Sequence, residues 1–283
     1  MSKDEKEIKE TPESAPKGPP KSVAREYFES FVVTLIMAIF GMTFILQAVT
    51  VPTGSMQNTI NIGDYLLVNK FIFAPGGKPL PFLPQKEIER GDIIVFKYPG
   101  NKLHPQNDKA RGIIPYQVNY VKRVIGLPGE TVEFRNNQVF VNGQLIPEHR
   151  IIADAPKDRS GEPQEDAALQ IKSEEPRQPD EKYDVYYSQE TMDAVKKGEN
   201  LSVAPYSYGA AGKIMQIPAD SYFVLGDSRD NSEDSRFWGF VSRDLVIGRA
   251  MFVYWSCDRA AGDGSVFSCL THPRLDRIGK LIR

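Results

Sequence analysis

Ser55 and Lys122 are the two residues of this chain whose types and surroundings could together carry out hydrolysis. Ser55 lies in the Gly-Ser turn Val51-Pro52-Thr53-Gly54-Ser55-Met56, close to the end of the only membrane-length apolar run. A serine hydroxyl is a weak nucleophile at neutral pH and needs a base within hydrogen-bond reach. A neutral lysine amine can be that base. The pair therefore suggests a serine hydrolase.

Lys122 stands in a stretch that reads as a strand, Tyr120–Gly129, and most of its neighbours there are apolar. Strand alternation puts Tyr120, Lys122 and Val124 on one face. Burial on that face, with the charge of Arg123 nearby, is expected to lower the pKa of Lys122 from about 10.4. The competing interpretation is a solvated Lys-Arg pair at a sheet edge.

The three histidines, His104, His149 and His272, stand in no pattern that suggests a catalytic triad. A third polar segment, Gly226–Arg236, follows an apolar strand and contains three aspartates, three serines and two arginines. A calcium loop or an ordinary surface turn would be alternatives, but the calcium-loop pattern is not matched. Paired aspartates and arginines are expected to position Ser232 so that its hydroxyl orients a lysine amine.

A nearly unbroken apolar run of 21 residues, Phe31–Val51, is long enough to cross a membrane as a helix. Basic residues precede it, and the first downstream is Lys70, which places the N-terminus in the cytoplasm and the rest of the chain outside. The alternative is a secretory signal cleaved near Gln47–Thr50. The long, acid-containing segment before the run and the length of the run favour a retained anchor. We therefore expect a disordered cytoplasmic tail at 1–29 and a single transmembrane helix at 30–51.

Beyond the membrane the sequence predicts a mainly β protein. Apolar segments bounded by turn residues predict strands at Tyr65–Phe73, Asp92–Tyr98, Asn119–Ile125, Ser221–Leu225 and Leu245–Trp255. A meander is expected over Thr131–Ile146, with turns at Asn136-Asn137 and Asn142-Gly143. Residues 52–146 and 214–283 are assigned to an antiparallel β core. Residues 147–213 are richer in charge and proline, and are expected to form an inserted, smaller cap region.

The overall composition limits the function classes. The chain has 283 residues, is 41% hydrophobic and 25% charged, and has a net charge of −2. It is therefore globular, with no global field that would recruit nucleic acid. Cys257 and Cys269 fall in the part expected outside the cytoplasm, where a disulfide is permitted, although two buried thiols are equally compatible. Their spacing does not suggest a zinc site, and no metal or other cofactor is expected.

The three segments around Ser55, Lys122 and Ser232 together resemble bacterial type I signal peptidase. That family consists of membrane-anchored Ser-Lys proteases that remove signal peptides from exported proteins. The resemblance extends from the anchor to about Trp255, apart from the insertion. It implies a signal-peptidase-like antiparallel β core in which Ser55 is the nucleophile, Lys122 the general base and Ser232 a hydroxyl that hydrogen-bonds Lys122.

The resemblance also implies roles for supporting residues. Asp227, Asp234 and Arg236 would hold the third segment, and the backbone N–H of Ser55 with the hydroxyl of Thr53 would bind the oxyanion. Two departures stand out: Gln57-Asn58-Thr59-Ile60 stands where the family commonly has a Pro-Thr pair, and Ser228 stands in place of a usual asparagine. Neither removes an atom that the chemistry needs.

Signal peptides end in small residues at −3 and −1, so a matching enzyme needs shallow apolar pockets beside the nucleophile. Candidates by position are Val51, Met56, Ile60 and Tyr120, lining a groove where an extended peptide adds as a strand. They could equally be core residues. The apolar, proline-broken segment Phe71–Pro84 either dips into the membrane interface or tucks against the protein.

The expected partners are signal peptides of exported preproteins, the lipid bilayer and the protein-export translocon. The expected location is the bacterial inner membrane, single-pass, with the N-terminus cytoplasmic and the catalytic domain on the periplasmic side. Two other functions stay open: a self-cleaving Ser-Lys regulatory protein, and a non-enzymatic membrane-tethered β-domain that binds a partner. The self-cleaving protein would need a regulatory domain in place of the charged N-terminal tail. Replacement of Ser55 would abolish the activity of either protease but would leave a non-enzymatic binding domain unaffected.

Overall fold

The computed structural model describes residues 22–74, 78–79, 81–157, 160, 162–164, 167–198, 207–258 and 266–283. The chain divides into two compact units, Met1–Gly41 and Met42–Arg283. The predicted disordered tail lies largely outside the described residues, since only residues 22–29 of it are among them.

The described part of the first unit is the helix α1, Val23–Phe40. It begins where the side chain of Ser22 accepts a hydrogen bond from the Arg25 N–H at 3.4 Å, which satisfies one of the free donors of the first turn. One turn of π-helix, Gly41–Ile45, follows it. The stretch Val23–Ile45 is long and apolar enough to cross a membrane.

The predicted helix boundaries, 30–51, are wrong at both ends. The Ser22 cap starts the helix earlier, and Leu46–Thr50 forms strand β1, paired antiparallel with β2. A continuous apolar run cannot by itself distinguish a helix from a strand that follows it directly.

The second unit is built around a seven-stranded sheet with the order β1-β2-β14-β3-β4-β12-β13, in which every neighbouring pair is antiparallel. This confirms the predicted mainly β class. Each predicted strand is present. Ser221–Leu225 has the predicted ends, three strands differ by one residue at one or both ends, and the strand predicted at Tyr65–Phe73 ends at Asn69. The strands besides β1 are β2 (Asp64–Asn69), β3 (Ile93–Lys97), β4 (Asn119–Gly126), β12 (Ser221–Leu225), β13 (Val241–Ser242) and β14 (Val246–Ser256).

A second, four-stranded sheet has the order β11-β5-β6-β7. Its strands are β5 (Thr131–Arg135), β6 (Gln138–Val141), β7 (Gln144–Leu145) and β11 (Met215–Gln216). The predicted turns of this meander are confirmed, because Asn136, Asn137, Asn142 and Gly143 have φ values of 47°, 60°, 50° and 76°. Asparagine and glycine tolerate this left-handed region better than other residues.

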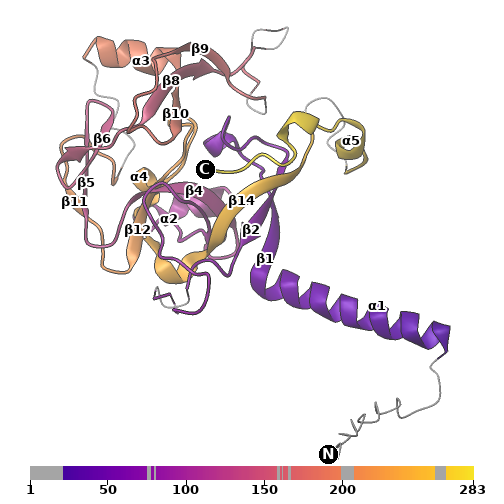
Figure 1. Ribbon diagram of the computed structural model, residues 1–283. Helices are drawn as coiled ribbons and strands as arrows, with labels where there is room; N and C mark the ends of the chain where they lie inside the picture. Colours follow the sequence, from indigo (N-terminus) through magenta and orange to yellow (C-terminus); the bar gives the residue numbers. More distant parts are fainter. Residues whose placement is uncertain are drawn as a thin grey trace, which may run out of the picture. The chain divides into compact units, whose positions relative to one another are not determined.

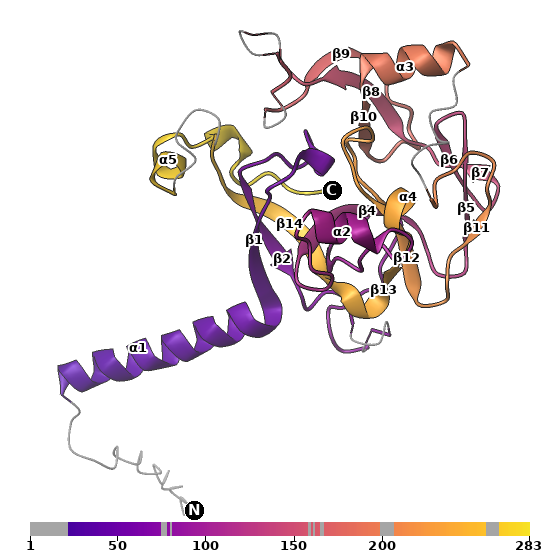
Figure 2. The same ribbon diagram turned by 180° about the vertical axis from the view of Figure 1, so that it is seen from behind.

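The region 147–213 contributes a three-stranded sheet of order β10-β8-β9, with α3 beside it (Figures 1 and 2). β8 pairs antiparallel with β9 and parallel with β10. The N-cap Ser188 starts α3 by accepting a hydrogen bond from the Thr191 N–H at 3.2 Å. The bounds are β8 (His149–Asp154), β9 (Gln170–Glu174), β10 (Asp184–Tyr187) and α3 (Gln189–Lys196).

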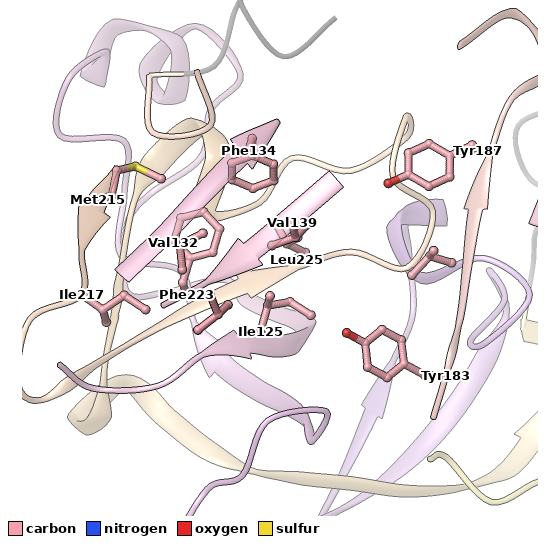
Figure 3. Packing of buried hydrophobic residues seen from close by; sticks show 12 residues of the cluster. Ile125, Val132, Phe134, Val139, Tyr183, Tyr187, Met215, Ile217, Phe223 and Leu225 are labelled. Carbon is pink, nitrogen blue, oxygen red and sulfur yellow. The ribbon is translucent and has the colours of Figure 1, made fainter. Parts of the chain in front are cut away.

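One apolar cluster joins this inserted region to the rest of the unit (Figure 3). Tyr183 and Tyr187 of the insertion pack in the same cluster as Phe223 and Leu225 of β12 and Ile125 of β4. All five side chains are at most 7% exposed. The insertion therefore shares a core with the strands that carry Lys122 and lead into the segment containing Ser232.

Short elements complete the unit. Cys257 at the end of β14 and Cys269 in α5 form a disulfide, the first of the two alternatives left open by the sequence. The helices are α2 (Pro105–Ala110), α4 (Ser235–Trp238) and α5 (Val266–Thr271), and 3₁₀ turns occur at Gly54–Met56, Arg243–Leu245 and Leu275–Arg277.

Candidate active site

Ser55 lies in a buried 3₁₀ turn between β1 and β2, with 8% of its surface exposed. Gly226, the first residue of the third polar segment, packs directly against this turn. A Cβ at Gly226 would come within 2.4 Å of the Ser55 carbonyl oxygen and 2.2 Å of the Ser232 Oγ, so only glycine fits there. Segments far apart in sequence thus meet at Ser55.

Lys122 reaches the same place from β4, where β3 pairs with it on one side and β12 on the other. Its side chain is buried, and its Nζ is hydrogen-bonded to the Ser55 Oγ. The ring of Tyr120, two residues earlier on the same face, lies 5.5 Å from the Nζ. The structure therefore brings the predicted nucleophile and the predicted base into contact.

Burial lowers the pKa of Lys122 from its usual 10.5 to about 8, because an ammonium group is poorly solvated there. The charges of Asp234 and Glu233 act in the opposite direction, while Arg236 adds to the lowering. A lysine with this pKa is partly neutral near pH 8 and can accept a proton from a hydroxyl.

The arginine whose charge helps to lower the pKa of Lys122 is Arg236, and not Arg123 as predicted. Arg123 forms a buried, two-pronged ion pair with Asp227, with its Nε 2.8 Å and an Nη 2.7 Å from the carboxylate oxygens. Strand alternation turns it to the opposite face from Lys122, and the carboxylate neutralises its charge.

Ser232 is buried near Lys122 but does not form the predicted hydrogen bond to it. Its hydroxyl donates to the Asp234 Oδ2 at 2.7 Å. The same carboxylate accepts from the Gly226 N–H at 3.0 Å and pairs with the Arg236 Nε at 2.8 Å. A charged carboxylate two residues away is a stronger acceptor than the amine, so the Ser232 proton goes to Asp234.

Asp234 is thus the common partner of Gly226, Ser232 and Arg236 within the segment. Burial alone would raise the pKa of Asp234, but the guanidinium of Arg236 and the hydrogen bonds outweigh this and hold it below its usual value. Asp227 serves the nucleophile turn as well, since its Oδ2 accepts a hydrogen bond from the Thr59 hydroxyl at 2.7 Å. Ser228, which stands where the family usually has asparagine, contacts the nucleophile through its backbone: its N–H donates to the Ser55 carbonyl at 3.2 Å. That contact does not depend on the side chain.

The hydrogen-bonded pair opens into a cavity of about 520 Å³. Thr53, Ser55, Lys122 and Ser232 line it, together with all four predicted pocket residues, Val51, Met56, Ile60 and Tyr120. Val51, Met56 and Ile60 also belong to a core cluster, so these three side chains pack in the core and line the cavity at the same time. Among the described residues that line the cavity there is no histidine.

The sequence did not indicate several residues that contact the site. Arg111 and Glu233 form an ion pair at the cavity, and Gln57 and Asn58 hold part of the insertion. The segment Phe71–Pro84 lies partly outside the described residues; of the rest, Phe73 is buried and Phe82 is 78% exposed.

Comparisons with known proteins identify the family. A family model described as "Signal peptidase, peptidase S26" matches residues 24–255. The chain is 31% identical over 247 residues to a signal peptidase I of Pseudomonas fluorescens, covering 82% of this chain and 72% of that relative. It is 30% identical over 282 residues to a signal peptidase I of Aquifex aeolicus, covering 90% and 97%.

A solved signal peptidase I structure from Enterococcus faecalis is 24% identical, covers 58% of this chain and 97% of its own, and superposes with a TM-score of 0.28. This partial overlap adds no argument, so the assignment rests on the family model and the curated relatives. The extent and identity of those matches show that the chain belongs to the signal peptidase family, peptidase S26.

Proposed function

We propose that this chain is a membrane-anchored signal peptidase that cleaves signal peptides from exported preproteins with Ser55 as nucleophile and Lys122 as general base. The observation that carries the assignment of residues is the hydrogen bond between the Lys122 Nζ and the Ser55 Oγ at a cavity wall. Family membership supports the reaction, because the curated relatives are named signal peptidase I.

In this mechanism Ser55 Oγ attacks the carbonyl carbon of the scissile peptide bond as neutral Lys122 takes the hydroxyl proton. The oxyanion is met by the backbone N–H of Ser55 and the hydroxyl of Thr53. Collapse of the tetrahedral intermediate breaks the C–N bond, and Lys122 returns its proton to the leaving amine. Lys122 then takes a proton from a water molecule, whose oxygen attacks the ester carbonyl carbon. Collapse of this second intermediate breaks the bond to the Ser55 Oγ, Lys122 returns the proton to that oxygen, and the signal peptide leaves with a free carboxyl group.

Substrate recognition falls to the apolar wall of the same cavity. The side chains of Val51, Met56, Ile60 and Tyr120 would form the pockets for the small residues at −3 and −1. An extended peptide would lie along the wall as an added strand. Because Val51, Met56 and Ile60 are already packed in a core cluster, the pockets would be shallow and would exclude large residues.

The apolar stretch Val23–Ile45 supports membrane anchoring. We propose a single-pass protein of the bacterial inner membrane with a cytoplasmic N-terminus, since the basic residues that flank the span lie upstream of it. The active unit would then act on the periplasmic side, on preproteins delivered by the export translocon, at the surface of the bilayer. Accessibility of single cysteines introduced at residue 10 and at residue 174 to a membrane-impermeant reagent tests this orientation.

The function is tested by incubating the detergent-solubilised protein with a purified preprotein and sequencing the new N-terminus. The expected product begins directly after a residue with a small side chain, and Ser55→Ala protein gives no product. A preprotein that stays intact with the wild-type chain, or equal cleavage by Ser55→Ala, would contradict the proposal.

A further inference from the structure

The residues that follow the nucleophile hold a segment of the insertion. The Asn58 Nδ2 donates to the Leu169 carbonyl at 3.1 Å, and the Leu169 N–H donates to the Asn58 Oδ1 at 2.9 Å. The Gln57 Nε2 donates to the Ala167 carbonyl. A single carboxamide thus makes the two hydrogen bonds that a neighbouring strand would make with Leu169.

Asn58 is firmly fixed within the turn that carries Ser55. Its φ of 69° lies in the left-handed region, which asparagine tolerates. Its N–H donates to the Asn61 Oδ1 at 2.8 Å, and the Ile60 N–H donates to the Met56 carbonyl at 2.7 Å. A shift at Leu169 would therefore be passed through a hydrogen-bonded turn to the nucleophile.

The insertion is attached at a second place, to the segment that contains Ser232. The Tyr186 N–H donates to the Asp227 carbonyl at 2.8 Å, and the Arg229 N–H donates to the Tyr186 carbonyl at 3.0 Å. The Ser188 N–H donates to the Asp230 Oδ2 at 2.7 Å. Strand β10 of the insertion thus pairs with the polar segment through one parallel β-bridge, between Tyr186 and Ser228.

A buried ion pair reinforces this second attachment. The guanidinium of Arg229 pairs with Glu148 of the insertion, and both side chains are at most 2% exposed. The Arg229 Nε also donates to the Gly226 carbonyl at 3.1 Å, and its own carbonyl accepts from the Arg236 Nη at 2.7 Å. Arg229 therefore connects the insertion directly to the partners of Asp234.

The first attachment holds the residues that follow the nucleophile, and the second holds the polar segment. These two parts of the chain also contact each other directly. That contact includes hydrogen bonds from the Ser228 N–H to the Ser55 carbonyl, from the Thr59 hydroxyl to Asp227, and from the Asp227 N–H to the Met56 Sδ at 3.4 Å. We propose that the insertion is a two-point clamp that holds the nucleophile turn against the segment carrying Ser232, with Asn58 and Glu148 as positioning residues. The catalytic part of this inference rests on the proposed peptidase function.

Asn58→Gly is the sharpest test, because glycine accepts the positive φ while losing both hydrogen bonds to Leu169. We expect kcat to fall about 10- to 100-fold with KM unchanged within about twofold, the usual result of misplacing a reacting group slightly. Asn58→Asp should be intermediate, since it can still accept from the Leu169 N–H. The matched control is Asn136→Gly, at an exposed asparagine of positive φ in the β5–β6 turn, which should keep wild-type kcat.

Amide hydrogen exchange gives a readout that does not depend on activity. In Asn58→Gly the Ser228 N–H should exchange faster than in the wild-type chain, and in Asn136→Gly it should not change. If either kcat or this exchange rate stays at the wild-type value in Asn58→Gly, the clamp is wrong. If Asn58→Gly does not fold, the same two criteria are applied to Asn58→Asp.

The two proposals fail in different ways. A wild-type chain that leaves preproteins intact contradicts the peptidase function. The clamp is then tested only by the exchange rate of the Ser228 N–H in Asn58→Gly. A wild-type chain that cleaves, with unchanged kcat in Asn58→Gly, contradicts the clamp and leaves the function standing.

Discussion

The Lys122 Nζ and the Ser55 Oγ are hydrogen-bonded to each other, although one comes from the middle of a sheet and the other from a turn. The contact is possible because Lys122 is on the β4 face that also carries Tyr120, while the next side chain, Arg123, is turned away to Asp227. A buried amine beside a serine hydroxyl is the arrangement that a Ser-Lys hydrolase requires.

Ser55→Ala and Lys122→Ala should each abolish preprotein cleavage while leaving the protein folded. Nucleophile and base act as one unit, so the double variant should be no slower than either single variant. Turnover is measured with purified preprotein, and folding is checked by thermal melting. Normal turnover by either single variant would remove that residue from the mechanism.

Ser232→Ala should lower kcat by about 10- to 1000-fold with little change in KM, which is less than the loss of either member of the pair. The reason is indirect, because the lost hydroxyl donates to Asp234, whose charge acts on Lys122. Steady-state kinetics over a range of preprotein concentrations separates the two parameters. A wild-type kcat would limit Ser232 to a structural role.

Glu233→Gln should move the acidic limb of the activity profile to lower pH. Glu233 lies at the cavity in an ion pair with Arg111, and its negative charge raises the pKa of Lys122. Removing that charge stabilises the neutral amine and leaves the Arg111 cation without its carboxylate. The profile of kcat/KM against pH is compared with that of Glu174→Gln, on exposed strand β9, which should match the wild type. An unmoved limb in Glu233→Gln would contradict this electrostatic account.

Lys122→Met should stabilise the fold near neutral pH while abolishing activity. Lys122 has a pKa of about 8 in the folded chain and 10.5 ordinarily, so below pH 8 the folded state holds a buried ammonium. Between pH 8 and 10.5 the unfolded state binds more protons, and stability rises with pH. The shift corresponds to about 3 kcal/mol, which methionine would recover at pH 7. Thermal melts should show an advantage of Lys122→Met at pH 7 that shrinks by pH 10.5; an equal advantage at both would be inconsistent with a depressed pKa.

The sequence was sufficient for the local features of the fold. Apolar segments bounded by turn residues located the strands that became β2, β3, β4, β12 and β14, and an Asn-Asn and an Asn-Gly dipeptide located the turns of the meander. It was insufficient for β1, because Leu46–Thr50 continues an apolar run without a break in composition. Only the pairing with β2 makes this segment a strand, and pairing is a long-range property.

The candidate site shows the same division. Alternation and motif spacing were enough to single out Ser55 and Lys122, whose contact the structure then forms. The partner of the Ser232 hydroxyl and the pairing of Arg123 could not be foreseen, since each depends on which charges the fold brings together. The same holds for Glu148, which looks like an ordinary surface acid until Arg229 is placed against it.

The most direct test of the Ser55–Lys122 mechanism is the dependence of kcat/KM on pH from about pH 6 to 11, which reports the pKa of the essential base in the free enzyme. Lys122 must lose a proton to act, so activity should rise through a single limb near its pKa of about 8 and stay high into the alkaline range. A limb near pH 6.5 that disappears when His104, His149 or His272 is replaced would show instead that a histidine is the base.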